Sequence, residues 1–427
     1  MFEIVEALFT TDATTLRSTN LKDATYDPVV RPAETINVKA GFSLFSIDTV
    51  DTAQQSLTVT GWITLTWNDY RLAWQPSSFG GIKEIHVLPS EVWKPEVIII
   101  NSVADRGVIH DDNLQLTVTY TGDVLWEPPG LYSTHCEIDI TYYPFDRQKC
   151  IIEMTSWSMT KDHLELDHAS DDIDTEDFRI DGEWNLYRTS VEDKDLPDTK
   201  PDGTVETFSQ LDFILVLERR PAFYAINYLL PIIAASFLSC VVFLVPMHSK
   251  EKVSFILTLI LSIAVLLTLI ASVLPHTSLT TSVLGIYLAT TMFLSVISAV
   301  ITVLLLIILH NNEKIDVTSS FYKLTIIISC AGCKRGSKNR SVGSKVVPNG
   351  TFPSKKNKQL MEAKKETEQK AIETSVSTDE CKKKAYTWTE VASIWDRFCF
   401  WTFLALTCIT TISFLVALGV GAVLNDV

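Results

Sequence analysis

Four long apolar segments occupy the second half of the chain, at about 223–245, 253–274, 283–309 and 398–423. Each is close to the roughly 20 residues that an α-helix needs to cross the hydrocarbon core of a bilayer. The pattern therefore predicts four transmembrane helices. Between the third and the fourth lies a polar stretch, 310–397, with 17 Lys or Arg and 10 Asp or Glu. If the first half of the chain is outside, the basic excess agrees with a cytoplasmic location for this stretch.

The second apolar segment, EKVSFILTLILSIAVLLTLIASVLP at 251–275, carries a stripe that includes several hydroxyl groups. Its members recur at steps of four and three residues and therefore share one helical face: Ser254, Thr258, Leu261, Val265 and Thr268. Hydroxyl groups inside a span either bond back to their own helix or turn toward protein or water. Taken alone, the stripe fits a packed bundle helix as well as a helix that lines a pore.

From about residue 34 to 219 the pattern changes to short alternating runs separated by turn residues. Such runs are typical of half-buried strands: INVKAGFSLFSI at 36–47, SLTVTGWITLTW at 56–67, LQLTVTYTG at 114–122, KCIIEMTSW at 149–157 and LDFILVLER at 211–219. No helix-length periodic segment interrupts them. The sequence therefore predicts an antiparallel β-sandwich, preceded by a short surface helix within residues 1–20.

Charge is distributed unevenly along the chain. Residues 1–219 contain 39 Asp or Glu and 16 Lys or Arg, whereas the whole chain has a net charge of −15. An acidic first half argues against nucleic acid as a partner and suits a surface that concentrates cations, although acidity can also serve only solubility. The opening MFEIVEALFT has no basic start and too short an apolar core for a secretory signal.

The motifs of enzymes are missing from the sequence. There is no phosphate loop, HExxH or nucleophile elbow. Cys330 and Cys333 form a CxxC, but no second pair lies in the same stretch, so no zinc site and no cofactor are expected. Only two of the eight cysteines lie in the first half, Cys136 and Cys150. An isolated pair in an extracellular domain indicates one disulfide. The loop between them has an apolar tip, Tyr143, Pro144 and Phe145, followed by Asp146, and an apolar tip on a soluble sandwich needs a partner such as the membrane domain.

The loop CEIDITYYPFDRQKC at 136–150 resembles the signature of the Cys-loop receptors, the pentameric ligand-gated ion channels, and the nicotinic branch in particular. Further stretches are similar to that family in the same order: WNDYRLAW at 67–74, WKPEVIIINS at 93–102, LWEPPG at 125–130, GEW at 182–184, Arg219–Pro221, Pro231 and WTEVASIWDRFCFW at 388–401. The resemblance covers nearly the whole chain.

The resemblance implies a homopentamer around a central pore in the plasma membrane, with an all-α four-helix transmembrane bundle in each subunit. The implied domains are an extracellular ligand-binding β-sandwich at 1–219, three transmembrane helices at 220–309, an intracellular loop with an amphipathic helix and a partly disordered segment at 310–397, and a fourth transmembrane helix with the C-terminus at 398–427.

On this resemblance the second span lines the pore. The implied pore-facing positions are Glu251, Ser254, Thr258, Leu261, Val265, Thr268 and Ser272. Leu261 would close the pore by dewetting, and five Glu251 carboxylates would attract monovalent cations. Ser249 and Lys250 stand where anion-selective members have a Pro-Ala pair, which favours cation selectivity. Ser272 stands where many cation channels have an acidic ring.

The resemblance also implies a ligand site between subunits, where an aromatic box holds a cationic amine by cation–π attraction. The implied positions are Trp157, Phe208 and Ile100 on one face and Trp62, Thr117, Leu125 and Glu127 on the neighbouring face. Ile100 replaces a nicotinic tyrosine, and the acidic loop at 186–208 lacks the vicinal cysteines of nicotinic agonist-binding subunits. Its acids either attract a cationic ligand or divalent ion, or solvate a mobile loop.

Gating is implied at the junction of the sandwich and the membrane domain, through Asp51, Tyr143, Pro144, Phe145, Asp146, Arg219 and Pro275. Thr52 stands where nicotinic subunits have a glutamate that pairs with the arginine before the first span. Because an unpaired buried arginine is costly, Arg219 is predicted to pair with Asp146 or Asp51.

The predicted function is a ligand-gated, cation-selective channel opened by a small extracellular ligand. One alternative is a non-conducting or obligate-partner subunit of the same fold, which Ile100 and the altered 186–208 loop keep open. Another is an adhesion-type membrane protein, which would need no polar stripe on its second span.

Overall fold

A computed structural model describes residues 2–21, 26–103, 109, 113–247, 249, 251–275, 280–311 and 388–424. They belong to two compact units. The first comprises Met1–Ile226, Leu269–Gly285 and Val416–Val427, and the second Asn227–Thr268 and Ile286–Leu415. The amphipathic and partly disordered segments predicted for the intracellular loop lie outside the described residues.

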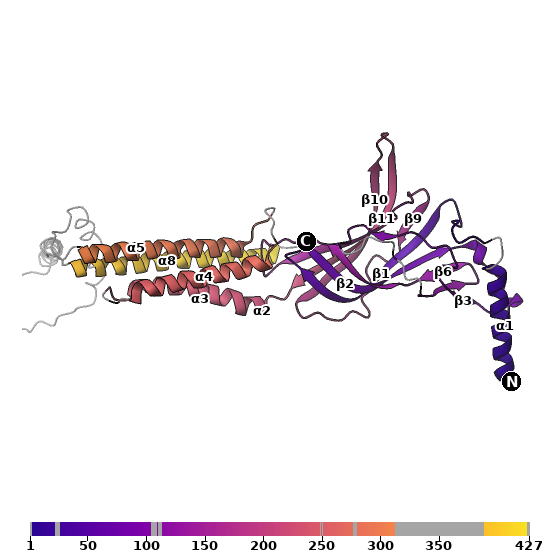
Figure 1. Cartoon of the computed structure of the whole chain (residues 1–427), viewed down its shortest axis with the longest axis horizontal. Coiled ribbons are helices and arrows are strands. Elements are labelled where there is room, and N and C mark those ends of the chain that lie inside the picture. Colours follow the sequence, from indigo (N-terminus) through magenta and orange to yellow (C-terminus); the bar gives the residue numbers. More distant parts are fainter. Residues whose placement is uncertain are drawn as a thin grey trace, which may run out of the picture. The chain divides into compact units, whose positions relative to one another are not determined.

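The first unit contains a β-sandwich (Figure 1). Its larger sheet has the order β3-β5-β6-β2-β1-β9, with β7 also paired to β2: β1 (Ile36–Asp51), β2 (Ser56–Asn68), β3 (Glu84–Val87), β5 (Leu116–Thr119), β6 (Asp123–Trp126), β7 (Pro129–His135) and β9 (Leu164–His168). The smaller sheet has the order β10-β11-β8-β4: β4 (Ile98–Ile99), β8 (Arg147–Thr155), β10 (Trp184–Thr199) and β11 (Val205–Arg219).

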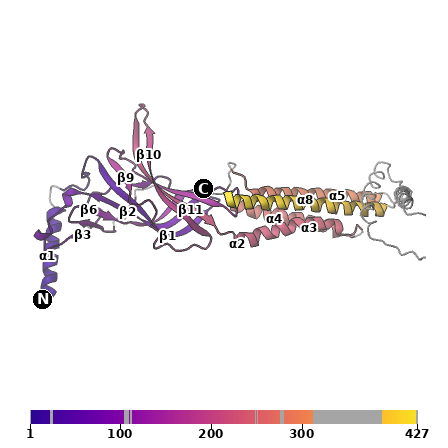
Figure 2. The ribbon, with the colours of Figure 1, turned by 180° about the vertical axis from the view of Figure 1, so that it is seen from behind.

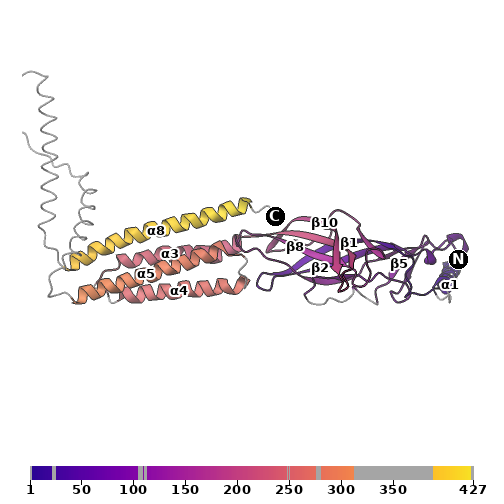
Figure 3. The same ribbon diagram turned by 90° about the horizontal axis from the view of Figure 1, so that it is seen from above.

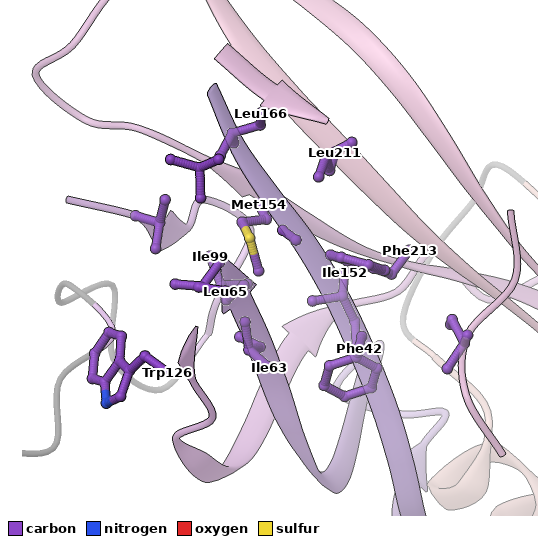
Figure 4. Packing of buried hydrophobic residues seen from close by; sticks show 14 of the residues in the cluster. Phe42, Ile63, Leu65, Ile99, Trp126, Ile152, Met154, Leu166, Leu211 and Phe213 are labelled. Atoms are coloured by element: carbon purple, nitrogen blue, oxygen red, sulfur yellow. The ribbon is translucent and has the colours of Figure 1, made fainter. Parts of the chain in front are cut away.

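Alternation along the strands produces the core between the sheets. Every second residue of β2 from Leu57 to Trp67 is buried, because successive side chains of a strand point to opposite faces. Phe42 of the larger sheet and Phe213 of the smaller sheet meet with ring centroids 5.8 Å apart. Figure 4 shows these rings with Ile152 and Met154 in one packed layer. The predicted Cys136–Cys150 disulfide is present.

Two features differ from the predicted antiparallel sandwich. The pairing of β1 with β9 is parallel, from Ile36 opposite Leu164 to Ala40 opposite His168. Alternation predicts which face of a strand is buried but not the direction of the neighbouring strand, so this parallel pairing could not be predicted from the sequence. The second difference is the segment 186–208, which was predicted as a loop and forms most of a long β10–β11 hairpin (Figure 1). Most of the side chains of β10 are exposed or half-buried, so it lacks the apolar alternation of a core strand.

Short helices complete the first unit. Helix α1 (Phe2–Asn20) lies beside β3 and β6 at one end of the sandwich (Figures 1 and 2). Its Leu16 is buried, and Arg17 pairs with Glu91 at 2.6 Å. Two 3₁₀ turns follow β2: η1 (Tyr70–Leu72) and η2 (Pro76–Ser78). Arg71 donates to the buried Asp69 at 2.8 Å within WNDYRLAW.

The helical part of the chain has these elements: α2 (Ala222–Tyr224), a π-helical turn η3 (Ala225–Leu229), α3 (Leu230–Val241), a 3₁₀ turn η4 (Val242–Leu244), α4 (Glu251–Val273), α5 (Val283–Asn311) and α8 (Trp388–Leu424). Within the described part of the chain, four segments are long and apolar enough to cross a membrane: Ala222–Leu244, Glu251–Val273, Val283–Ile307 and Thr389–Gly421. Figure 3 shows α8 and α4 on opposite sides, with α3 and α5 between them. Helix α8 begins before the predicted apolar segment because Val391, Ala392 and Asp396 continue its buried face.

Polar contacts also connect the helices of the second unit. The Tyr287 hydroxyl of α5 lies 3.0 Å from Ser236 Oγ of α3 and 3.0 Å from Thr411 Oγ1 of α8. Lys252 of α4 donates to Asp396 of α8 at 2.7 Å, with the lysine side chain fully buried. These bonds give buried polar groups the partners that an apolar surrounding does not supply.

Candidate functional site

The predicted stripe of α4 lies on its exposed side. Leu261 is 62% exposed and Val265 is 50% exposed. The remaining members are exposed as well: Glu251, Ser254, Thr258, Thr268 and Ser272. The opposite side of the helix is buried and consists of Lys252, Ile256, Leu259, Ile263 and Ile270. Helix α4 therefore packs through one side and presents the other, the side that carries the stripe.

Hydroxyl groups of the stripe donate to carbonyls of their own helix. Thr258 Oγ1 donates to Phe255 at 2.8 Å, and Ser272 Oγ donates to Leu269 at 2.7 Å. Such a bond satisfies the hydroxyl proton but leaves the oxygen lone pairs available on the exposed side. The sequence left open whether these hydroxyl groups form a hydrogen bond to the same helix or turn toward protein or water. In the structure, hydroxyl groups of the stripe show both.

Four of the predicted ligand residues share the outer face of the larger sheet. Thr117 of β5 lies directly opposite Leu125 of β6. Glu127 accepts a hydrogen bond from Thr64 Oγ1 of β2 at 3.3 Å. Trp62 precedes Thr64 by two residues and therefore points to the same face. The neighbouring positions Ile63 and Leu65 are buried in the core, so this face is the side of the sheet away from the second sheet.

The other three predicted ligand residues belong to the smaller sheet. Trp157 follows β8 and is 66% exposed. Phe208 of β11 lies opposite Leu196 of β10. Ile100 follows β4, and its amide donates to the carbonyl of Glu153 at 2.9 Å. Each chain therefore presents two separate groups of candidate residues, one on each sheet.

Sequence reasoning missed His86, which lies beside the first of these groups. His86 of β3 faces Thr117 in register, and Thr117 Oγ1 lies 3.2 Å from His86 Nδ1. The histidine is exposed between the buried residues Ile85 and Val87. The alternation of apolar and polar residues in IHV indicates an exposed His86. Because the strand is only four residues long, it was not predicted.

Arg219, at the end of β11, is buried and pairs with two carboxylates. Its Nε donates to Asp146 Oδ1 at 2.9 Å, and its Nη1 donates to Glu183 Oε1 at 2.8 Å. Burial acts against the charge of Arg219, but the attraction of Asp146 and their hydrogen bond outweigh it and raise the pKa of Arg219. The predicted pairing with Asp146 is confirmed, and Glu183 is a second partner that the sequence did not reveal. Asp51, the other predicted partner, instead accepts from the Gln54 amide at 2.9 Å.

The loop between the cysteines packs within the first unit. Tyr143 is 3% exposed and Pro144 is buried, whereas Phe145 is half-buried. The Thr141 carbonyl accepts from the Val283 amide of α5 at 3.0 Å. Thr52, in the turn between β1 and β2, donates to the Val273 carbonyl of α4 at 2.6 Å. Pro275, just after α4, is buried.

Two family matches follow one another along the chain. Residues 14–221 match the family "Neurotransmitter-gated ion-channel ligand binding domain", and residues 228–327 match the "Neurotransmitter-gated ion-channel transmembrane region". The chain is 31% identical over 307 residues to "Neuronal acetylcholine receptor subunit alpha-3" of Homo sapiens, an alignment that covers 71% of this chain and 60% of that relative. It is 33% identical over 299 residues to "Acetylcholine receptor subunit beta-like 2" of Drosophila melanogaster, covering 65% and 55% respectively.

The chain belongs to the neurotransmitter-gated ion channels, the Cys-loop receptors, and is similar to nicotinic acetylcholine receptor subunits. A β-sandwich followed by four apolar helices is the fold of this family. Its members are channels rather than enzymes, and they are multi-pass proteins of the plasma membrane with the ligand-binding domain outside. The chain spans 60% of the length of the human relative.

Proposed function

We propose that this protein is a subunit of a ligand-gated, cation-selective channel, a homopentamer in which five α4 helices line the pore. The exposed stripe of α4 carries this proposal. If that side faced lipid, Glu251 and the hydroxyl groups would lie against hydrocarbon or its border, where charged and polar groups are costly. A water-filled axis gives them solvent instead. The buried opposite side, with Ile256 and Ile263, supplies the contact with the other helices of the same chain.

Two positions on the stripe have separate roles in the proposal. Leu261 lies near the middle of α4, where five leucine side chains would form a constriction that closes by dewetting. Glu251 is the first residue of α4, at the cytoplasmic end, where five carboxylates would concentrate cations and repel anions. The acidic first half of the chain adds to the attraction for cations.

We place the ligand between two neighbouring subunits. The candidate residues form two groups on different sheets, which supports a site completed by two copies: Trp157, Phe208 and Ile100 from one, and Trp62, Thr117, Leu125 and Glu127 from the next. An exposed ring such as Trp157 attracts a cationic amine by roughly 0.5–2 kcal/mol. A small cationic amine is therefore the proposed class of agonist.

A second candidate is a subunit that opens only with other subunits, or that does not conduct. Ile100 favours it, because an isoleucine cannot supply the cation–π attraction of an aromatic ring. The hairpin tip favours it too, since Lys200–Thr204 contains no cysteine pair. Both features weaken the amine site without changing the stripe of α4.

Expression of the chain alone, in cells that lack related subunits, separates the two candidates. A Leu261→Thr variant should give a current without ligand, because a polar ring wets the proposed constriction. Leu266→Thr is the matched control, since position 266 lies roughly 140° around the helix at 3.6 residues per turn. The reversal potential of the Leu261→Thr current should shift when external Na⁺ is replaced by an impermeant cation but not when chloride is replaced, and Glu251→Gln should weaken that cation preference.

The outcomes are distinct. A current in Leu261→Thr but not in Leu266→Thr supports a self-sufficient pore with Leu261 on its axis. Surface-expressed protein that is silent in both variants favours the obligate-partner or non-conducting subunit. Equal currents in both variants would contradict the assignment of the stripe.

A screen of amines on the active protein then tests the ligand class, with Trp157→Ala expected to abolish the response and Trp157→Phe to weaken it.

A further inference from the structure

The first unit contains a cavity of about 560 Å³ just before the first membrane-spanning segment. Arg147 and Arg220 form part of its polar wall, and Phe145, Pro221 and Ala222 part of its apolar wall. The spanning segment begins at Ala222. The cavity therefore lies where the chain passes from the sandwich into the bilayer.

The polar wall includes a row of side chains across three paired strands. Glu218 of β11 lies opposite Arg147 of β8 on one side and Asn185 of β10 on the other. Arg147 donates to Glu218 Oε1 from Nε at 3.1 Å and from Nη2 at 3.0 Å. Its guanidinium also lies 4.2 Å from the centroid of the Tyr187 ring. These contacts hold Arg147 in place and compensate the charge of Glu218.

Arg220 adds a cation to this row. Successive side chains of an extended strand point to opposite faces, so Arg219 turns into the core, whereas Arg220 points to the side of Glu218. Arg219 is 3% exposed, and Arg220 is exposed. No carboxylate of the described residues pairs with Arg220. The charges of Arg147 and Glu218 compensate each other. Arg220 therefore gives this wall a net positive charge, although the domain as a whole is acidic.

The position of Arg220 along the chain matches the depth of lipid headgroups. The hydrocarbon core is about 30 Å thick and the whole bilayer about 40–45 Å, so each headgroup layer is roughly 5–7.5 Å deep. Two extended residues span about 6.6 Å, which is the reach from Ala222 back to Arg220. Beyond Ala222, Phe223 and Ile226 are 62% and 66% exposed and continue the apolar surface toward the acyl chains.

We propose that this cavity binds the phosphate of a glycerophospholipid from the outer leaflet. Arg220 and Arg147 donate to the phosphate oxygens, and the Asn185 carboxamide donates a further hydrogen bond. Guanidinium groups match the geometry of phosphate and form strong charge-assisted bonds with it. Phe145 and Pro221 contact the glycerol region, and Phe223 and Ile226 contact the acyl chains. The apolar wall and the position of Arg220 at the depth of the headgroups favour a lipid over a free anion as the ligand. The proposed lipid site does not depend on whether the pore conducts.

Photolabelling of the full chain in phosphatidylcholine nanodiscs tests the proposal. The probe is a phosphatidylglycerol with a photoreactive group on its acyl chain near the glycerol, titrated into the disc and mapped by peptide mass spectrometry. Labelling should concentrate on residues 222–226. Arg220→Gln should reduce the apparent affinity roughly tenfold, the loss expected for one charge-assisted hydrogen bond, and Arg220→Lys should reduce it less. Arg188→Gln, an exposed arginine of β10 outside the cavity lining, should leave it unchanged.

Other results would overturn the proposal. One is labelling of residues 222–226 that is unaffected by Arg220→Gln. Another is competition by soluble glycerophosphate as effective as that by unlabelled lipid, which would show a site for small anions instead. If Arg220→Gln folds poorly, Asn185→Ala provides the second variant, because Asn185 is exposed and lies in the same row. Unchanged labelling in Asn185→Ala would then contradict the assignment of this row as the polar wall of the lipid site.

Discussion

Two buried cations, Arg219 in the first unit and Lys252 in the second, are stabilised in different ways. Arg219 pairs with Asp146 at 2.9 Å and with Glu183 at 2.8 Å. Its guanidinium also lies 4.2–5.3 Å from the centroids of three aromatic rings: Trp184, Tyr143 and Tyr224. Lys252 is fully buried and pairs with Asp396 at 2.7 Å, and its ammonium also donates to the sulfur of Met247 at 3.5 Å.

The difference follows from the two side chains. A guanidinium has five donors in a fixed plane and stacks on rings, whereas an ammonium has three donors around a point. Arg219 can therefore share its charge among several partners. Lys252 depends mainly on Asp396, whose Oδ1 has no hydrogen-bond partner among the described residues. Loss of one partner should consequently cost more at Lys252 than at Arg219.

The largest effect is expected for Asp396→Ala. This change leaves the Lys252 ammonium buried without a carboxylate, and breaking a buried ion pair in this way costs about 3–5 kcal/mol. We expect a large loss of folded protein, measured as surface expression and as the melting temperature of the detergent-solubilised chain.

The double variant Lys252→Met with Asp396→Leu is the control for that experiment. It removes both charges and keeps similar volumes, so it should recover most of the stability lost in Asp396→Ala. A double variant no better than Asp396→Ala would mean that packing, rather than the unpaired charge, causes the loss.

A smaller effect is expected for Asp146→Asn. Asp146 is 1% exposed and accepts two bonds from Arg219 and one from Gln148. Asparagine keeps one acceptor oxygen, and Glu183 still opposes the charge of Arg219, so we expect a loss of about 1.5–3 kcal/mol. The melting temperature should fall less than in Asp396→Ala. A fall as large as in that variant would show that the partners of Arg219 do not substitute for one another.

Glu183→Gln should have a still smaller effect. The Glu183 side chain is 47% exposed, and solvent-exposed ion pairs contribute only about 0.2–1 kcal/mol. Asp146 continues to hold Arg219 from its buried side. A double-mutant cycle with Asp146→Asn measures the coupling directly, and additive losses would contradict the sharing of one charge by two carboxylates.

The same two sites show what could be predicted from the sequence. The pairing of Arg219 with Asp146 was predicted because both belong to motifs that resemble a known family. GEW at 182–184 was also noted as a family motif, but Glu183 was not predicted as a partner of Arg219. The local pattern does not indicate that the start of β10 pairs with the end of β11. The pair of Lys252 and Asp396 joins α4 to α8 across a long stretch of sequence, and a contact between two helices depends on how they pack rather than on either pattern.

The hydrophobic periodicity predicted which face of a helix or strand is buried better than it predicted which element packs against that face. On α4 it separated the exposed stripe from the buried side, since a helix has one period whatever packs against it. On the sandwich it predicted β2 and β11 but missed β3 and β10. Strand β3 is too short to show a period, and β10 is poor in buried side chains. The register that places His86 beside Thr117 is a property of the sheet and is not visible in either segment alone.

The smallest expected effect concerns an acid on the smaller sheet. Partial burial, and then the neighbouring charge of Asp212, raise the pKa of Glu153, although Lys194 and His135 oppose the shift. A raised pKa means that the folded state binds this proton more tightly than the unfolded chain does, so stability should decline as pH rises through the interval between the ordinary and the raised pKa. Glu153→Gln should remove that part of the decline in melting temperature. Glu176→Gln, an exposed acid, should not, and an identical pH profile in both variants would contradict the prediction.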